Sequence, residues 1–165
     1  MRHMIGILMQ NEAGALTRVA GLFSSRGYNI ESLSVAPTDD PTVSRLTLVT
    51  SGSDAVIQQI VNQLKKLIDV VSVEDLTGGE HIERELVLLK LRVEPARAEV
   101  IRGFIARSGG SLLEFSGDCL IVELLGGEAQ ISRLLRELAE QAELLEVVRS
   151  GALGISHPAR GGTPS

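Results

Sequence analysis

One order of secondary-structure elements is predicted twice along this chain, and it constrains the fold more than any other feature. Alternating apolar residues predict strands, and apolar residues at i, i+3, i+4 and i+7 predict helices that bury one face. Residues 1–77 give the order βαββαβ, and residues 82–155 give it again. This order is that of the split-βαβ, ferredoxin-like unit. We therefore predict an α+β protein of two consecutive ferredoxin-like domains, with a mobile tail over residues 156–165.

Domains of this kind are expected to associate. Each has roughly 75 residues, a size at which one hydrophobic core gives only marginal stability. An open four-stranded sheet also exposes the backbone of its two edge strands. We therefore predict a homodimer.

Composition and charge exclude several classes of partner. The chain has 16 Lys and Arg against 21 Asp and Glu, a net charge of −5, whereas phosphate binding needs a basic face. The predicted strands also lack the aromatic platforms with which such sheets bind RNA. No run approaches the ~20 apolar residues of a membrane span, and the run Met4–Met9 is too short for a signal-peptide core. We expect a cytoplasmic protein with no nucleic-acid or membrane partner.

Catalytic and metal-binding patterns are missing from the sequence. His3, His81 and His157 are far apart, without metal-ligand spacing, and are interpreted as surface residues. The single cysteine, Cys119, excludes an internal disulfide and a multi-cysteine metal site. No nucleophile motif or phosphate-binding glycine loop occurs. We therefore expect no catalytic residue, no metal ligand and no cofactor in this chain.

The start of the first predicted helix is the most informative local feature. Asn11 is the predicted N-cap, and Gly14 lies in the first turn, where glycine costs up to ~1 kcal/mol relative to alanine. A glycine there is tolerable where a ligand approaches closely, and a helix start offers N–H donors to a carboxylate. The alternative is that Asn11 is merely a cap and that Gly14 eases helix–sheet packing. The sequence pattern leaves both interpretations open.

A family resemblance extends over nearly the whole chain. It rests on NEAGALTRVAGLFSSRGYNIESL at residues 11–33 and SVAPTDDP at residues 34–41, then on QLKKLIDV at 63–70, EREL at 83–86 and EVVRSG at 146–151. These segments resemble the acetohydroxyacid (acetolactate) synthase small subunit, and the first domain resembles an ACT domain, an amino-acid-sensing form of the ferredoxin-like fold. The sequence departs from the usual members around Glu94–Glu99.

The resemblance implies a regulatory role. Family members have no active site and bind a separate catalytic subunit, which uses thiamine diphosphate, magnesium and FAD to make acetolactate or acetohydroxybutyrate from pyruvate. The small subunit raises that activity and makes it sensitive to valine, an end product of branched-chain amino-acid biosynthesis. The alternatives are an amino-acid-sensing ACT module that regulates a different enzyme and, with little support, a small ferredoxin-like enzyme.

The resemblance also implies an effector site between two ACT domains. Backbone donors would bind the carboxylate of valine, Asn and carbonyl oxygens its ammonium group, and an apolar pocket that includes Ile30 its isopropyl group. One chain would contribute the loop at the first helix, with Asn11, Ala13, Gly14, Ala15 and Leu16. The other chain would contribute Asn29, Ile30, Glu31 and Ala36.

Overall fold

The computed structural model describes residues 1–158 as two compact units, each with the predicted α+β architecture. The first unit contains Met1–Ile82 and, from the end of the chain, residues 152–158, while the second contains Glu83–Gly151. The expected second domain, 82–155, therefore differs from the observed unit at its carboxyl end. The expected tail begins at Ser156, which lies in a strand, and residues 159–165 are outside the described part of the chain.

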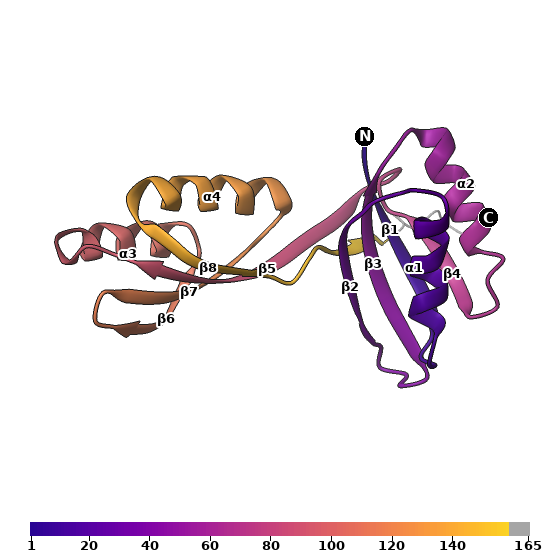
Figure 1. The fold of residues 1–165 in the computed structure, drawn as a ribbon, viewed down its shortest axis with the longest axis horizontal. Helices are drawn as coiled ribbons and strands as arrows, with labels where there is room; N and C mark the ends of the chain where they lie inside the picture. The colour runs from indigo at the N-terminus through magenta and orange to yellow at the C-terminus, as the bar shows by residue number, and fades with distance from the viewer. Residues whose placement is uncertain (159–165) are drawn as a thin grey trace. The chain divides into compact units, whose positions relative to one another are not determined.

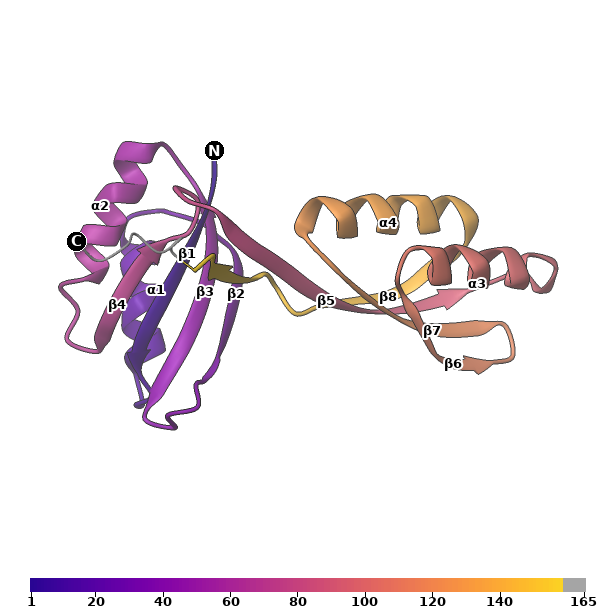
Figure 2. The same cartoon turned by 180° about the vertical axis from the view of Figure 1, so that it is seen from behind.

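The first unit is an antiparallel four-stranded sheet with two helices on one face (Figures 1 and 2). The strand order is β2-β3-β1-β4, so β2 and β4 are the edges. The predicted βαββαβ order is confirmed. Its elements are β1 (Arg2–Gln10), α1 (Ala15–Ser25), β2 (Ile30–Pro37), β3 (Val43–Ser51), α2 (Asp54–Leu64) and β4 (Val70–Asp75).

The apolar face of α2 is buried as its sequence spacing predicts, and α1 buries Ala15 together with part of its predicted face. On α1 the buried side chains are Ala15, Val19 and Phe23, which pack with Ile5 and Ile7 of β1. On α2 they are Ile57, Ile60, Val61 and Leu64. Burying one such side chain stabilises the fold by roughly 1.5–3 kcal/mol, so these faces fix both helices on the sheet.

The interpretation of His3 as a surface residue is wrong. His3 lies on β1 with only 4% of its surface exposed. Its Nε2 is 3.3 Å from Asp54 Oδ1 at the start of α2, and its Nδ1 is 3.8 Å from Asp75 Oδ2 at the end of β4. Its position near the amino terminus gave no sign of this burial, because the flanking carboxylates are distant in sequence.

The end of the chain returns to the first sheet. Ala152 N donates to Ser32 Oγ at 3.0 Å, and Arg45 Nη2 donates to the Gly154 carbonyl oxygen at 3.2 Å. Gly154 lies in β9 (Leu153–Ser156), where a Cβ atom would be 2.7 Å from Leu76 Cδ1. A side chain at Gly154 would therefore require Met4 and Leu76 to move, so the chain end packs closely with the first unit.

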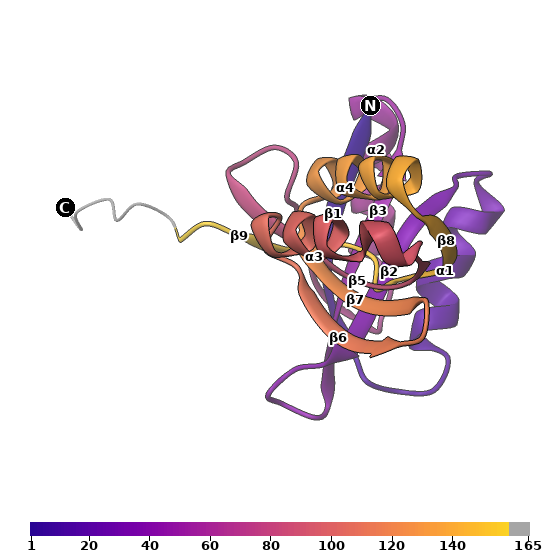
Figure 3. The same cartoon turned by 90° about the vertical axis from the view of Figure 1, so that its left-hand side faces the viewer.

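The second unit repeats the topology with the order β6-β7-β5-β8. Its two long helices, α3 and α4, lie on the same side of its sheet (Figures 1 and 3). Gly117, with φ of 61°, makes the tight turn between β6 and β7. Its elements are β5 (His81–Arg92), the short 3-10 helix η1 (Pro95–Arg97), α3 (Ala98–Arg107), β6 (Ser111–Ser116), β7 (Cys119–Gly126), α4 (Glu128–Gln141) and β8 (Glu143–Arg149).

None of the helices within residues 1–158 is long and apolar enough to cross a membrane. The same residues contain no group of three or more His, Cys, Asp or Glu side chains that could hold a metal ion.

Candidate functional site

The loop between β1 and α1 is held by the loop between β2 and β3. Asn11 N donates to the Thr42 carbonyl oxygen at 2.8 Å, and Asn11 Nδ2 donates to the Pro41 carbonyl oxygen at 2.9 Å. Asn11 is therefore not the N-cap of α1, and that prediction is wrong. Its side-chain amide joins two loops instead, and its side chain remains exposed at the end of the sheet.

Gly14 is the N-cap residue, and its backbone explains why it is glycine. Its φ of 86° and ψ of −11° are left-handed, a conformation that costs an ordinary L-residue roughly 1–2 kcal/mol. Gly14 is also exposed, so helix–sheet packing does not account for it. No described side chain caps α1. Ala15 N donates to the Glu12 carbonyl oxygen at 3.2 Å, and the N–H groups of Leu16 and Thr17 remain available to an anion.

An arginine beside this helix start was missed by the sequence analysis. Arg18 Nε donates to Asp69 Oδ2, and Arg18 Nη1 is 3.0 Å from where a Cβ on Gly14 would be. Asp69 is 5% exposed, and the hydrogen bond from Arg18 lowers the pKa of its carboxyl group below the usual range. The Arg18 guanidinium thus offers further donors beside the open N–H groups, while Asp69 balances its charge. The sequence did contain a sign of this arrangement, because Arg18 follows Gly14 by four residues, the spacing of neighbours on one helix face.

Of the residues expected from the second chain, Asn29, Ile30 and Glu31 lie at the start of β2, and Ala36 lies near its end. The Asn29 carbonyl oxygen accepts a hydrogen bond from Thr50 Oγ1 at 2.7 Å, and Glu31 Oε1 accepts one from Ser51 Oγ. Ile30 is half-buried against the core of its own unit. A register shift follows between Ile30 and Ser32, which marks an irregularity at this end of the edge strand.

Within one chain the expected site residues lie in two groups. Strand register pairs Ala36 with Arg45, and Arg45 with Leu8, so Ala36 lies at the same end of the sheet as Asn11. It pairs Ile30 with Thr50, and Thr50 with His3, at the opposite end. At ~3.3 Å per residue the two ends of β2 are roughly 20 Å apart. One chain therefore brings together Asn11, Gly14 and Ala36, but it does not bring Asn29, Ile30 or Glu31 to them.

Comparison with known proteins gives matches along almost the whole chain. A model of the small-subunit-like ACT domain of acetohydroxyacid synthase matches residues 5–72, and a model of the small subunit of acetolactate synthase matches residues 84–158. The acetolactate synthase isozyme 3 small subunit of Salmonella typhimurium is 44% identical over 156 residues, covering 94% of this chain and 96% of the relative. Its Escherichia coli counterpart is 42% identical with the same coverage.

A solved structure matches both units together. The crystal structure of the acetolactate synthase small subunit from Thermotoga maritima has a TM-score of 0.84 and 30% sequence identity to this chain. The match covers 95% of this chain and 98% of the Thermotoga chain.

Proposed function

Because the chain belongs to the acetolactate synthase small-subunit family, we propose that it is a cytoplasmic regulatory subunit that activates the catalytic subunit and makes it sensitive to inhibition by valine. In this proposal the chain has no active site of its own. Thiamine diphosphate, magnesium and FAD belong to the catalytic subunit, which makes acetolactate or acetohydroxybutyrate. The open helix start at Gly14, beside Arg18, is the observation that carries the effector part of the proposal.

The chemistry of this helix start suits the carboxylate of an amino acid. Uncapped N–H groups, the positive end of the helix dipole and the nearby Arg18 guanidinium all favour an anion. The carbonyl of Asn29 is already an acceptor for Thr50, but its side-chain amide is exposed. We assign that amide of the second chain to the ammonium end of valine, and Ile30 to the isopropyl group.

The proposed site requires a homodimer. The two ends of β2 are roughly 20 Å apart, so one chain cannot form the whole site. β2 is an edge strand that pairs with β3 on one side only. The backbone groups on its other side can pair with a second copy of the chain. Two identical chains related by a two-fold axis would form two equivalent sites.

The first test measures activity of the reconstituted enzyme. We expect the purified chain to convert no pyruvate alone. Added to the catalytic subunit with its cofactors, it should co-purify with it, raise the rate of acetolactate formation and make that rate fall with valine. Turnover of pyruvate by this chain alone, or failure to bind the catalytic subunit, would remove the regulatory assignment. Activation without any valine response would leave the regulatory role and remove the effector site.

A second test asks whether the site draws on two chains. Gly14→Asp should damage the helix start, and Asn29→Ala should damage the β2 end, so each variant alone should lose valine binding. In a random mixture about half of the dimers contain both variants, and each of these has one intact site. One of the two sites is intact in half of the dimers, so calorimetry should recover about a quarter of the wild-type valine sites. A mixture that recovers none, or a valine-saturated monomer in sedimentation, would contradict the two-chain site.

A further inference from the structure

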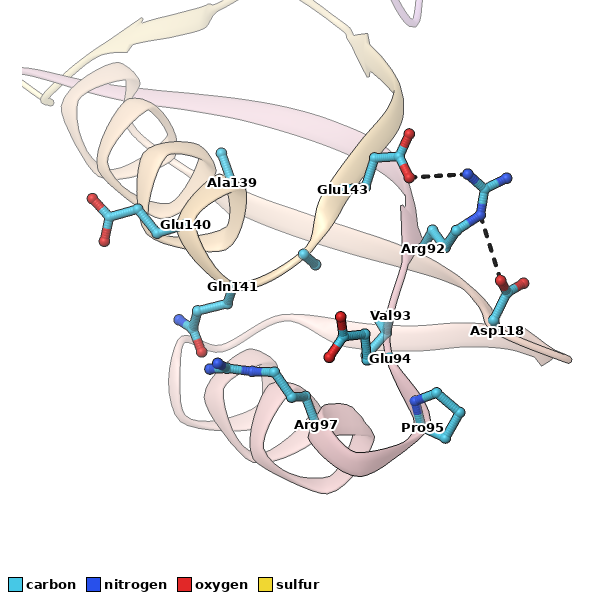
Figure 4. Close-up of a pocket in the computed structure, with 11 residues that line it drawn as sticks. Arg92, Val93, Glu94, Pro95, Arg97, Asp118, Ala139, Glu140, Gln141 and Glu143 are labelled. Carbon is cyan, nitrogen blue, oxygen red and sulfur yellow. Dashed lines mark hydrogen bonds and ion pairs between the residues drawn. The ribbon is translucent and has the colours of Figure 1, made fainter.

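A polar pocket of about 630 Å³ lies at one end of the second unit (Figure 4). Three connections converge on it: β5 to η1, β6 to β7, and α4 to β8. The corresponding connections of the first unit are those from β1 to α1, from β2 to β3 and from α2 to β4, and they include the Asn11–Gly14 loop. The two units thus offer surfaces at the same topological position.

One wall of the pocket has its charges paired within the protein. Arg92 Nη1 donates to Glu143 Oε2 at 2.9 Å, and Arg92 Nε is 3.4 Å from Asp118 Oδ2. The hydrogen bond with Glu143 is the main reason that the pKa of Arg92 is raised. Ala142 adds apolar surface, and Val93 behind the wall is only 3% exposed. This wall is therefore a prearranged surface on which one guanidinium is shared by two carboxylates, so it keeps an excess of negative charge.

The remaining charged groups of the pocket have no partner in residues 1–158. These are Arg97, Glu94 and Glu140, which form no hydrogen bond or ion pair with described side chains. Figure 4 shows Arg97 and Glu94 on the same side of the pocket, with Arg97 extending toward the end of α4. Gln141, at the end of α4, donates a hydrogen bond from its Nε2 to the Glu137 carbonyl oxygen at 3.3 Å.

The end of α4 adds negative potential to this group. The last turn of α4 contains no basic residue, so its terminal carbonyl groups are not neutralised by a cation of the helix itself. A helix carboxyl terminus is equivalent to roughly half a negative charge and favours a cation. The pocket therefore has groups of both signs close together: Glu94, Glu140 and the end of α4 are anionic, and Arg97 is cationic.

We propose that this pocket binds a small zwitterion of the α-amino-acid class. Arg97 binds the carboxylate through its planar guanidinium, which suits two parallel hydrogen bonds. Glu94 and the carboxyl end of α4 bind the ammonium group. Ala142 contacts a short side chain. This site is separate from the valine site proposed at Gly14, and it does not depend on that proposal.

The test uses nuclear magnetic resonance of the full chain with L-alanine as the probe. We expect saturable shifts in the amide signals of residues 92–94, 96–97 and 139–143. N-acetyl-L-alanine lacks the ammonium group and isopropylamine lacks the carboxylate, so each should bind at least about tenfold more weakly. Arg97→Gln and Glu94→Gln should each weaken L-alanine binding by a similar factor. Arg107→Gln, at the far end of α3, is the matched control and should not.

Four results would overturn the proposal. The first is the absence of saturable shifts at these residues up to tens of millimolar L-alanine. The second and third are equal binding of N-acetyl-L-alanine, which indicates a simple anion site, and equal binding of isopropylamine, which indicates a simple cation site. The fourth is L-alanine binding that survives both substitutions. Because the readout is confined to amides of the second unit, failure here is distinguishable from loss of valine inhibition in the synthase assay.

Discussion

Replacement of Arg149 by methionine is expected to lower the free energy of unfolding of the second unit by about 2 kcal/mol. Arg149 on β8 binds Glu85 on β5 through two parallel contacts, Nε to Oε1 at 2.7 Å and Nη2 to Oε2 at 2.8 Å. The hydrogen bond with Glu85 is the main reason that the pKa of Arg149 is raised. Glu85 is only 3% exposed, so removal of Arg149 leaves a buried carboxylate without its partner.

The expected size follows from the exposure of the two partners. Removal of one partner from a fully buried ion pair costs about 3–5 kcal/mol. The Arg149 side chain is 39% exposed, so water and salt screen part of the interaction, and we expect the lower figure.

Two further variants make this prediction specific. Lys90→Met breaks the exposed Lys90–Glu146 pair on the same two strands, and it should cost less than about 1 kcal/mol. The double replacement Glu85→Met with Arg149→Met removes both charges and should be less destabilising than Arg149→Met alone. Urea unfolding followed through amide signals of β5 and β8 measures all three. Equal destabilisation by Arg149→Met and Lys90→Met would show that burial of Glu85 has no special cost.

The order of elements could be predicted because each depends on a local pattern. Along β5, Val87, Leu89 and Leu91 are buried while Leu88 and Lys90 between them are exposed, which is the two-residue period of a strand with one buried face. The buried faces of α1 and α2 follow the helical period in the same way. Such patterns need no knowledge of distant residues, and for this reason the repeated βαββαβ order was recoverable from the sequence.

The features that were missed depend on partners far away in the sequence. Asn11 was expected to cap α1, but its amide binds Pro41, thirty residues later. His3 is buried against carboxylates of α2 and β4, and residues 152–158 return to the first unit after the whole second unit. Local sequence patterns do not predict such long-range contacts. The left-handed backbone of Gly14 is a local property. It was missed because a helix cap usually has extended backbone, so the sequence analysis placed the cap at Asn11 and Gly14 in the first turn.

The backbone of Gly14 also changes how the effector site must be tested. A side chain at this position adopts a left-handed conformation, which aspartate and asparagine tolerate better than most residues. Its Cβ would be 3.0 Å from Arg18 Nη1, at the end of a flexible side chain that can move. Gly14→Asp and Gly14→Asn therefore share nearly the same strain and bulk, and they differ in one negative charge.

We expect Gly14→Asp to abolish the valine response while the variant still activates the catalytic subunit. Like charges about 4 Å apart repel by about 1 kcal/mol in water and about 4 kcal/mol near a protein surface. An aspartate would both repel the valine carboxylate and attract the Arg18 guanidinium away from it. The valine concentration for half-inhibition should therefore be at least about tenfold higher for Gly14→Asp than for Gly14→Asn, measured in the reconstituted synthase.

Equal loss of valine inhibition in both variants would assign the effect to bulk or strain. Loss of activation together with inhibition would mean that Gly14 serves the fold, and an unchanged valine response would mean that valine binds elsewhere.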